Sequence, residues 1–532
     1  MDNFWGCARV KIVTGERMAE IDRQAMTEYG IPGLILMENA GLQVVNLLRE
    51  LSPEIQSTRI VVLCGRGNNG GDGFVIARHL LRLGYRVEVW ALGEVSQYKG
   101  DAQVNYNILL KNGINVLVAD EGGPTVSLLH MEKKGIIVDA LLGTGLKREV
   151  SEPFASIIKA INDSPARVVS VDIPSGISAD NGQIMGMGVK ADYTVTFALP
   201  KKGLFLFPGA DYSGEIRVVD IGIPGEITSA DDIKENFITS DLVYSLLPRR
   251  IANGHKGSYG RALILAGSPG MSGAAVLAGE SALRGGAGLV YLGTAEEISS
   301  VLEAKLKEVI VIGFQGDGNG NLIADSFKKI NKKALGCQAV AFGPGLVPNQ
   351  ETLELLKSLI EELSIPLVVD AGGLGALTLE PSFLPSNGAP LILTPHPGEM
   401  ARLTGNRTDE VQGERWELTS RKALEWGAVV LLKGAYTTIA LPDGELYVNP
   451  TGNPALSTAG TGDLLTGLIT SLIAQGLSPG HASICGVFVH GLAADLLIKE
   501  RGLRGHIAGD VLNYIPQAIN KLLSGKDERD GR

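Results

Sequence analysis

Short apolar runs alternate with amphipathic segments along the first half of the chain. Met18, Ile21 and Ala25 recur at helical spacing after Thr14, which predicts a helix with a threonine N-cap. A second helix is predicted after Gly33. The apolar runs that follow predict strands at Arg59–Cys64, Arg86–Leu92, Ile114–Val118, Gly135–Asp139, Arg167–Asp172 and Tyr193–Ala198. Strands and helices in alternation predict a mainly parallel sheet with helices on both faces, a three-layer α/β/α domain.

The second half repeats this alternation after a charged segment. Gly225–Leu247 has few glycines and no strand pattern, so we expect a boundary there, between domains 1–225 and 226–532. Beyond it, His255–Leu283 predicts a strand, a glycine-rich turn and a helix. Further strands are predicted at Leu289–Leu292, Ala339–Phe342, Leu367–Asp370, Leu391–Leu393 and Val429–Leu432. The second domain is therefore also expected to be α/β.

The stretch Asn449–Gly467 carries the clearest candidate chemistry. Its small residues at 457–462 lead directly to Asp463, and the apolar run that follows predicts a loop opening a buried helix. Small side chains leave backbone N–H groups accessible, and with the helix dipole these favour a phosphate or an oxyanion. Asp463 would then accept a proton from a nearby hydroxyl. The alternative is that Asp463 is only an N-cap.

Polar side chains also follow three of the predicted strands in the first domain. Asn68, Asn69 and Asp72 lie in a glycine-rich loop after the first, Asp139 and the loop Gly143–Arg148 follow the fourth, and Asp172 and Ser175 follow the fifth. Carboxyl ends of parallel strands meet at one edge of a sheet, where ligands bind. Oxygen-rich surroundings suit a hard cation, and a carboxylate there could act as acid or base. The alternative is that these side chains only satisfy turns.

Composition narrows the choice of partners. The chain has 532 residues, 69 of them glycine, a hydrophobic content of 45% and a formal net charge of −10. An acidic chain with few basic clusters argues against a nucleic-acid or anionic-membrane surface. Cys7, Cys64, Cys337 and Cys485 form no CxxC pair, and the N-terminal segment has no apolar h-region. We therefore expect a protein of the reducing cytoplasm that is neither exported nor membrane-bound.

Three motifs give the first domain a family resemblance. NNGGDG (Asn68–Gly73), VDALLGTG (Val138–Gly145) and VDIPSG (Val171–Gly176) resemble the YjeF N-terminal domain, the NAD(P)H-hydrate epimerase family, over about Met18–Pro224. This implies a Rossmann-like domain that interconverts the R and S hydrates at C6 of the nicotinamide ring. The implied substrate contacts are Asn68, Asn69, Gly70, Gly71, Asp72, Gly143, Thr144, Gly145, Leu146, Lys147, Arg148, Glu149 and Asp172, with Asp172 also the candidate acid/base. The implied potassium ligands are Asn69, Asp139 and Ser175.

The second domain has a resemblance of its own. FGPGL (Phe342–Leu346), VVDAGGL (Val368–Leu374), TPHPGEM (Thr394–Met400), LLKGAYT (Leu431–Thr437) and the Asn449–Gly467 stretch resemble the ribokinase-like fold. Over about His255–Pro516 the similarity is to ADP/ATP-dependent NAD(P)H-hydrate dehydratases. The implied hydrate contacts are Ala274, Gly345, His396 and the catalytic base Asp463. The implied nucleotide contacts are Lys433, Gly434, Ala435, Tyr436, Thr437 and Gly462, and Glu399 would assist Mg²⁺.

Together the two resemblances predict a bifunctional repair enzyme. Its substrates would be NADHX and NADPHX, its cofactors K⁺ and Mg²⁺, and its co-substrate ADP or ATP, with ADP the family expectation. A homo-oligomer is expected. One alternative is a ribokinase-like kinase of a hydroxymethylpyrimidine or hydroxyethylthiazole vitamin precursor, with an accessory N-terminal domain. The other is a nucleotide-sensing binding protein in which Asp172 and Asp463 are caps.

Overall fold

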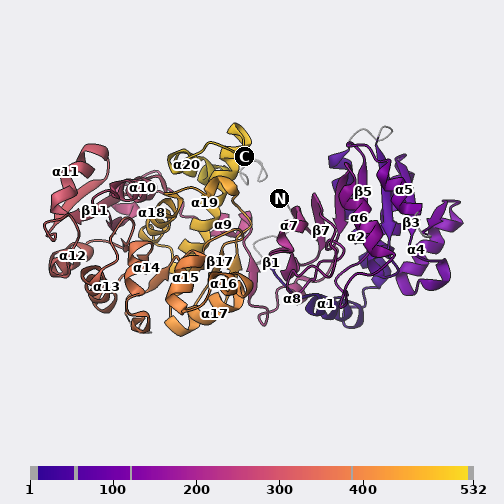
Figure 1. The fold of residues 1–532 in the computed structure, drawn as a ribbon, viewed down its shortest axis with the longest axis horizontal. Coiled ribbons are helices and arrows are strands. Elements are labelled where there is room, and N and C mark those ends of the chain that lie inside the picture. Colours follow the sequence, from indigo (N-terminus) through magenta and orange to yellow (C-terminus); the bar gives the residue numbers. More distant parts are fainter. Residues whose placement is uncertain (1–9, 53–57, 120–122, 385–387, 525–532) are drawn as a thin grey trace. The chain divides into compact units, whose positions relative to one another are not determined.

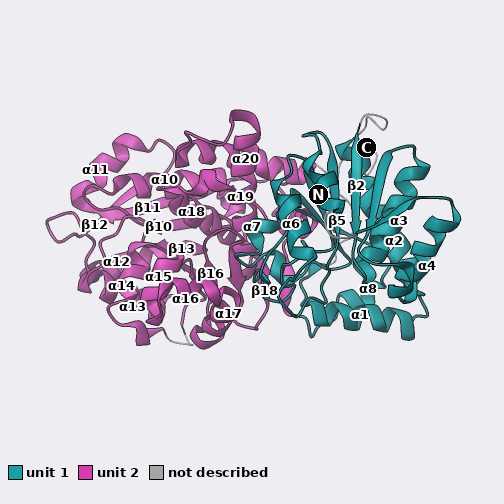
Figure 2. Cartoon of the chain, turned by 45° about the vertical axis from the view of Figure 1, so that its right-hand side comes forward, with its two compact units in different colours: residues 1–233 teal, residues 234–532 magenta. Residues whose placement is uncertain are grey.

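The chain folds into two compact units. A computed structural model describes residues 10–52, 58–119, 123–384 and 388–524. The units are Met1–Ile233 (unit 1) and Lys234–Arg532 (unit 2), coloured separately in Figure 2. Each is built on a sheet flanked by helices (Figure 1), and the predicted α/β class with mainly parallel strands is confirmed.

The sheet of unit 1 is entirely parallel. Its strand order is β4 (Val116–Val118), β3 (Arg86–Ala91), β2 (Arg59–Cys64), β5 (Ile136–Ala140), β6 (Arg167–Val171), β7 (Tyr193–Phe197) and β8 (Glu215–Val219). The chain runs outward from β2 to β4 and then returns to β5 on the other side of β2. The strand order therefore reverses between β2 and β5, and a crevice forms beyond the carboxyl ends of these two strands.

Helices cover both faces of this sheet because its central strands are apolar on both sides. Val61 and Leu63 of β2 belong to a buried cluster with residues of α5 and α6, whereas Val62 faces Gly73 of α3. Successive strand residues point to opposite faces, so the sheet carries two helical layers. Helices α2 (Gly33–Leu51), α3 (Asn68–Arg82) and α4 (Gly100–Lys111) pack together, as do α5 (Gly123–Leu129) and α6 (Phe154–Asp163).

The first predicted helix is confirmed as α1 (Gly15–Thr27). The Thr14 hydroxyl accepts a hydrogen bond from the backbone N–H of Arg17 at 3.1 Å, as an N-cap does. Met18, Ile21 and Ala25 are buried, and the helix brings Asp22 to the substrate-sized cavity described below.

The segment Gly225–Leu247 departs from the prediction. It contains α8 (Gly225–Thr228), β9 (Glu235–Phe237) and α9 (Ser240–Leu246), and β9 pairs in parallel with β18 (Leu446–Val448). The expectation that no strand lies there was wrong. The strand is only three residues long and carries Glu235 and Asn236, so it shows no apolar alternation.

The sheet of unit 2 is parallel through most of its width. From β9 and β18 the order continues with β17 (Thr438–Ala440), β16 (Val429–Leu432), β15 (Leu391–Leu393), β14 (Leu367–Val369), β13 (Ala339–Phe342), β10 (Arg261–Leu265), β11 (Leu289–Ala295) and β12 (Ile310–Phe314). Among the described pairings from β9 to β12, those of β17 with β16 and β18 are antiparallel and the others are parallel. The chain returns from β12 to β13, beside β10, so the carboxyl ends of the central strands again form the edge where a ligand is expected.

Two helical layers also enclose the sheet of unit 2 (Figure 1). One layer contains α10 (Ser272–Arg284), α18 (Thr461–Ala474), α19 (Pro479–Arg501) and α20 (Ala508–Ser524), which share one buried apolar cluster with the strands. The other contains α12 (Phe327–Ala334), α13 (Gln350–Glu362), α14 (Gly372–Leu377), α15 (Pro397–Thr404), α16 (Thr408–Gly413) and α17 (Arg415–Trp426). Helix α11 (Glu296–Lys305) packs beside β12.

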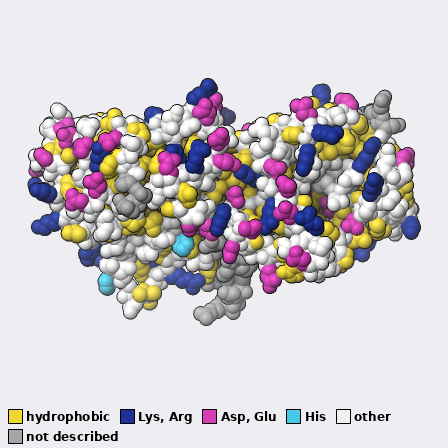
Figure 3. Space-filling model, turned by 90° about the horizontal axis from the view of Figure 1, so that it is seen from below, with side chains coloured by type: hydrophobic (Ala, Val, Ile, Leu, Met, Phe, Trp, Pro, Cys, Tyr) yellow, Lys and Arg dark blue, Asp and Glu magenta, His cyan; other side chains and the backbone are white. Residues whose placement is uncertain are grey.

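The helix α19 is apolar because it lies inside unit 2. By length and composition it is the one described helix that could cross a membrane, but 72% of its most apolar window is buried within the protein. It packs between α18 and α20, as a core helix does. On the face drawn in Figure 3, Lys and Arg side chains are interspersed with Asp and Glu.

Helices α10 and α18 approach each other closely at Gly467. A Cβ atom at Gly467 would lie 2.1 Å from the backbone oxygen of Ala278, so Gly467→Ala must push the two helices apart. We expect unit 2 to lose about 1–3 kcal/mol of unfolding free energy, measured by urea denaturation. Gly413→Ala is the control, because a Cβ there meets nothing within 4 Å and alanine favours helix. Equal stabilities of the two variants would contradict the described packing.

Candidate active sites

A cavity of about 790 Å³ lies at the edge of unit 1 where β2, β5 and β6 end. Many of the predicted substrate contacts line it: Asn68, Asn69, Asp72, Gly143, Thr144, Gly145, Leu146, Lys147, Arg148 and Asp172. They come from the start of α3, the segment after β5 and the residue after β6. The reversal of strand order between β2 and β5 thus places side chains about 100 residues apart in sequence around one space.

Three predicted contacts do not line this cavity: Gly70, Gly71 and Glu149. A Cβ atom at Gly70 would lie 1.8 Å from the Gly65 oxygen, and one at Gly71 would lie 2.7 Å from Met37. These glycines allow the start of α3 to pack closely. The predicted loop was wrong here, because α3 already begins at Asn68.

Asp172 is held in an unusual conformation at the end of β6. Its φ angle is +65°, a left-handed conformation that aspartate tolerates better than most residues. Its Oδ1 atom accepts hydrogen bonds from the Phe197 backbone N–H at 3.1 Å and the Thr196 hydroxyl at 3.2 Å. The same oxygen forms an ion pair with the ammonium group of Lys201, whose side chain is 1% exposed. One face of the Asp172 carboxylate is therefore fixed by the protein.

Two further carboxyl groups line the same cavity near Lys201. Burial raises the pKa of Asp22 to about 6, a shift that Lys201 opposes and Asp172 reinforces. Burial, with the charges of Asp172 and Asp22, raises the pKa of Asp72 well above its usual value. Among the described residues, neither carboxyl has a recorded hydrogen bond or ion pair. One ammonium group thus faces three carboxyl groups, and the protein favours a proton on at least one of them.

Asp139 lies beneath the cavity as a buried carboxylate. It accepts hydrogen bonds from the Ser170 hydroxyl at 2.8 Å and from the Ser175 hydroxyl and backbone N–H at 2.5 and 2.9 Å. Burial raises its pKa. The Ser175 hydroxyl and the Asn69 side chain both contact the Leu142 oxygen, each at 3.1 Å. Contacts with the Leu142 oxygen thus bring the predicted ligands Asn69 and Ser175 together, and Ser175 links them to Asp139.

In unit 2, Asp463 lies in the first turn of α18. The N-cap is Gly460, in a left-handed conformation with φ +94°, and no side chain caps the helix. The N-cap alternative for Asp463 was therefore wrong, whereas the predicted buried helix is confirmed. Burial, with the charge of Asp370, raises the pKa of Asp463 to about 7, although Lys433 opposes the shift.

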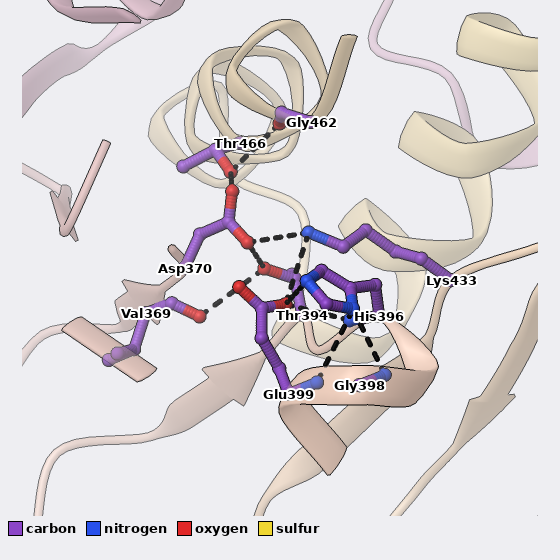
Figure 4. A network of polar contacts seen from close by, with 9 residues as sticks. All are labelled: Val369, Asp370, Thr394, His396, Gly398, Glu399, Lys433, Gly462 and Thr466. Atoms are coloured by element: carbon purple, nitrogen blue, oxygen red, sulfur yellow. Dashed lines mark hydrogen bonds and ion pairs between the residues drawn. The ribbon is translucent and has the colours of Figure 1, made fainter. Parts of the chain in front are cut away.

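An ion pair between Asp370 and Lys433 lies next to Gly462 at the start of α18 (Figure 4), and both charges act on Asp463. The Lys433 ammonium lies 2.7 Å from Asp370 Oδ1. Burial alone would raise the pKa of Asp370, but Lys433 and the hydroxyls of Thr394 and Thr466 outweigh it, so the pKa falls below its usual value. The Thr466 hydroxyl donates to Asp370 Oδ2 at 2.8 Å. The end of β14 is thereby connected to α18.

The start of α15 provides a second acidic contact to Lys433. Glu399 Oε2 lies 3.9 Å from the Lys433 ammonium and accepts a hydrogen bond from the His396 backbone N–H at 2.8 Å. The His396 Nδ1 atom accepts from the N–H groups of Gly398 and Glu399 (Figure 4). This reciprocal capping box fixes the imidazole, whose side chain is 51% exposed. The other imidazole nitrogen, Nε2, lies 3.6 Å from Glu399 Oε2.

The remaining predicted contacts fall into two groups. A Cβ atom at Gly345, where φ is +66°, would lie 3.1 Å from the Ala274 Cβ, so these two residues touch. The loop at 433–437 follows β16, and a Cβ atom at Gly462 would lie 3.4 Å from the Lys433 ammonium. Gly434, Ala435, Tyr436 and Thr437 complete that loop, and the Thr437 hydroxyl donates to the Gly434 oxygen at 2.9 Å.

The sequence prediction missed residues that the fold brings to both sites. Asp22 and Lys201 in unit 1 come from α1 and from the segment after β7, and neither lies in a glycine-rich motif. Asp370 was noted only as the end of a predicted strand. His490 of α19 is buried, its Nε2 atom has no hydrogen-bond partner, and burial lowers its pKa to about 4.

Arg415 supports the 433–437 loop from behind. It is 5% exposed and donates to the backbone oxygen of Leu432 at 3.0 Å and to the side chain of Gln412 at 2.5 Å. Burial lowers its pKa to about 10. Because the Arg415 guanidinium donates to the carbonyl that precedes the 433–437 loop, it holds the backbone of the loop in place.

Comparison with known proteins covers both units. Residues 33–203 match the family described as YjeF-related protein N-terminus, and residues 262–517 match the family described as NAD(P)H-hydrate dehydratase. The chain is 42% identical to the bifunctional NAD(P)H-hydrate repair enzyme Nnr of Moorella thermoacetica, over 96% of this chain and 97% of the relative. Identity to the Escherichia coli enzyme of the same name is 33%, over 95% and 93%.

A solved structure resembles unit 2. It is the ADP/ATP-dependent NAD(P)H-hydrate dehydratase from Bacillus subtilis, co-crystallised with ATP and Mg²⁺. The sequence identity is 36% and the TM-score 0.48, and the match covers 54% of this chain and 98% of that one.

The two aspartates beside Lys433 lead to opposite predictions for stability. Folding raises the pKa of Asp463, so the protein loses stability as this carboxyl ionises between about pH 4 and about pH 7. At pH 8 we expect Asp463→Asn to be more stable than wild type, by on the order of 1–2 kcal/mol after allowance for partial exposure. The difference should shrink at pH 5, as measured by thermal unfolding at both values.

Asp370→Asn is the matched comparison. It leaves the Lys433 ammonium without its 2.7 Å partner, and we expect a loss of about 3–5 kcal/mol. A stabilised Asp370→Asn variant, or a destabilised Asp463→Asn variant at pH 8, would contradict the described charge arrangement.

Proposed function

The chain belongs to the family of bifunctional NAD(P)H-hydrate repair enzymes, and from that premise we propose which residues carry its two reactions. The enzyme interconverts the R and S hydrates of NADH and NADPH and dehydrates the S hydrate with consumption of a nucleotide. The assignment of roles rests mainly on one observation. Each unit has a site at the carboxyl ends of its strands, and each site contains an aspartate paired with a lysine: Asp172 with Lys201 and Asp370 with Lys433. The family favours this function over the vitamin-precursor kinase and the nucleotide sensor.

We assign epimerisation to the cavity of unit 1. Its volume of about 790 Å³ is in the range of pockets that enclose small organic ligands. The backbone N–H groups of Gly143–Gly145 and the side chains of Lys147 and Arg148 would receive the phosphates. Asp172, fixed on one side by Lys201, would act as acid or base at C6. Asn68, Asn69 and Asp72 would contact the rest of the dinucleotide.

The cluster under the cavity fits a potassium ion. Asn69, Asp139 and Ser175 would hold it, and when bound it would supply positive charge beneath the substrate. The fit rests on Asp139, a fully buried carboxyl group whose recorded partners are hydroxyl and backbone N–H groups. A buried carboxylate of this kind requires a cation or a proton.

Unit 2 would dehydrate the S hydrate by way of a phosphate ester. Asp463 takes the proton of the C6 hydroxyl as a phosphoryl group transfers to that oxygen, and phosphate then leaves with loss of the C5 proton, which restores the dihydropyridine. A pKa of about 7 lies near the pH at which a general base is most effective. The backbone N–H groups at the N-terminus of α18 would stabilise the negative charge that develops on the phosphoryl group during transfer. His396, Ala274 and Gly345 would hold the hydrate.

The nucleotide would lie over the loop at 433–437, next to Gly462. The ammonium of Lys433 is paired with Asp370, so the backbone of the loop, fixed by Arg415, would supply the contacts to the phosphates. In the described residues no three His, Cys, Asp or Glu side chains form a metal cluster. Mg²⁺ would therefore be held with the nucleotide phosphates and waters, with Glu399 to assist. ADP is the proposed donor.

The cellular setting is proposed from the state of the cysteines. Cys64, Cys337 and Cys485 are free and buried, and Cys7 lies outside the described residues, which suits a reducing cytoplasm. We propose a cytoplasmic homo-oligomer that binds neither nucleic acid nor membrane.

Substitution of one aspartate at a time should separate the two reactions. The substrate is a mixture of R and S hydrates, incubated with Mg²⁺, K⁺ and either ADP or ATP while recovery of dihydronicotinamide absorbance is followed. We expect Asp463→Asn to lower the rate of recovery about 100- to 10,000-fold, because the general base is lost. Asp172→Asn should recover the S fraction at the normal rate and then stop.

Each variant is the control for the other, and the preferred nucleotide is read from the wild-type traces. Normal recovery of both epimers by Asp463→Asn would overturn the assignment of the base. Accumulation of a stable phosphorylated product would favour a kinase.

The potassium site predicts a selective ion dependence. Epimerisation by the wild type should be faster in K⁺ than in Li⁺ at equal ionic strength, because the smaller ion fits the same oxygen atoms poorly. Asp139→Asn should remove that preference and lower the rate, measured by chromatographic separation of the epimers. Equal rates in both salts for the wild type would argue against a potassium site.

A further inference from the structure

The cavity of unit 1 contains acid/base groups beyond Asp172. Lys201 is the buried cation at its base, and Asp22, Asp72 and Asp172 are all close enough to interact with that charge. Asp172 forms the ion pair. The other two carboxyl groups have no hydrogen bond or ion pair among the described residues, and both line the cavity.

The three carboxyl groups approach the cavity from different elements. Asp172 follows β6, Asp72 lies in α3, and Asp22 lies in α1. Asp72 is deeply buried, 8% exposed, whereas Asp22 is half-buried and shares the cavity wall with Met18 and Met26 of the same helix. Helix α1 and the end of β6 therefore both contribute to the wall of the cavity that a planar ring would enter.

Inversion at C6 requires chemistry on both faces of the ring. The C6 carbon carries a hydroxyl and is bonded to the ring nitrogen, whose lone pair can expel the hydroxyl if an acid protonates it. Water must then add to the opposite face while a base removes its proton. One carboxylic acid and one carboxylate on opposite faces meet this requirement, and the reverse reaction exchanges their roles.

Building on the epimerase activity proposed for this cavity, we propose that Asp22 is the second catalytic residue of epimerisation, opposite Asp172. In one direction the Asp22 carboxylic acid gives its proton to the C6 hydroxyl, the C–O bond breaks and water leaves with the bonding electron pair. The nitrogen lone pair forms the N1–C6 double bond. A second water adds to the other face, and the Asp172 carboxylate takes its proton. Atoms and charge balance, and one proton has moved from Asp22 to Asp172.

Lys201 explains how the two groups differ although both are aspartates. Its ammonium forms an ion pair with Asp172, whereas burial favours the neutral form of Asp22. A pair that shares one proton is the working state of such a two-base enzyme. The charged groups that also line the cavity are Arg66, Asp72, Asp101, Lys147 and Arg148.

The test measures epimerisation alone, from one pure epimer without nucleotide, with the epimers separated by chromatography. We expect Asp22→Asn to lower kcat at least 100-fold with little change in KM, and Asp22→Glu to restore part of the loss. Glu16→Gln is the control, because Glu16 is an exposed acid in the first turn of the same helix. Dehydration of the S hydrate by unit 2 should stay at the wild-type rate in every variant, which shows that unit 2 is intact; the partial recovery by Asp22→Glu reports on the fold of unit 1.

Two readouts distinguish catalysis from a structural role. For the wild type, kcat/KM should fall as the pH rises through about 6, the pKa of Asp22 in the free enzyme, and Asp22→Asn should lack that limb. Formate should restore activity to Asp22→Ala but not to Asp172→Asn.

In ¹⁸O-labelled water each inversion should introduce one solvent oxygen at C6.

Three outcomes would overturn the proposal. Normal inversion by Asp22→Asn would remove Asp22 from the chemistry and leave the epimerase assignment intact. Inversion without incorporation of solvent oxygen would exclude cleavage of the C6–O bond. Absence of inversion in the wild type would overturn both the epimerase assignment and the role of Asp22.

Discussion

Both sites share one constraint. In each of them a single lysine ammonium group faces more carboxyl groups than it can neutralise. In unit 1 Lys201 pairs with Asp172 while Asp22 and Asp72 are left without a cation. In unit 2 Lys433 pairs with Asp370 while Asp463 is left with a raised pKa. Because a buried charge without a partner is costly, the excess carboxyl group retains a proton until higher pH. Each site thereby contains a proton acceptor or donor that works near neutrality.

The position of each lysine follows from the parallel sheet. Asp172 follows β6 and Asp370 follows β14, both at carboxyl ends of central strands, while each lysine follows a strand farther along the chain. Every such strand end points to the same edge, so residues separated by 29 positions in unit 1 and 63 in unit 2 meet there. The helices then supply the second carboxyl group: α1 contributes Asp22 and α18 contributes Asp463. The sheet fixes the ion pair, and the helix brings the group that exchanges protons.

Local pattern was enough to predict most strands and the residues directly after them. β2, β13, β15 and β16 match the predicted ranges, and Asp139, Asp172 and Asp463 stand out because each lies next to an apolar run. Asp22 and Lys201 had no such signal. Asp22 looks like any polar residue on an amphipathic helix, and Lys201 follows β7 outside the motifs that carry the family resemblance. Their roles depend on distances across the fold, which the spacing along one segment does not encode.

The prediction of a loop at the start of α3 was wrong for a different reason. Glycine usually weakens helices, so the run Asn68–Gly73 reads as a loop. In the fold these glycines let the helix begin against the backbone of Gly65 and the side chain of Met37, and tertiary packing outweighs propensity. The result places Asn69 and Asp72 on a rigid turn of helix above Asp139. A loop would have to lose conformational entropy on binding substrate, whereas this helix already holds its polar groups in place.

The charge arrangement also explains how a carboxyl group and a phosphate can share the start of α18. The backbone N–H groups there attract anions, and an ionised Asp463 would repel the incoming phosphate. In the proposed role of base, Asp463 would become neutral once it accepts the proton of the hydroxyl, at the moment when negative charge develops on the transferred group. Lys433 could not cancel that charge fully, because it is paired with Asp370. The proton would therefore serve two purposes: its removal from the hydroxyl activates the nucleophile, and its arrival on Asp463 removes the repulsion that would oppose phosphoryl transfer.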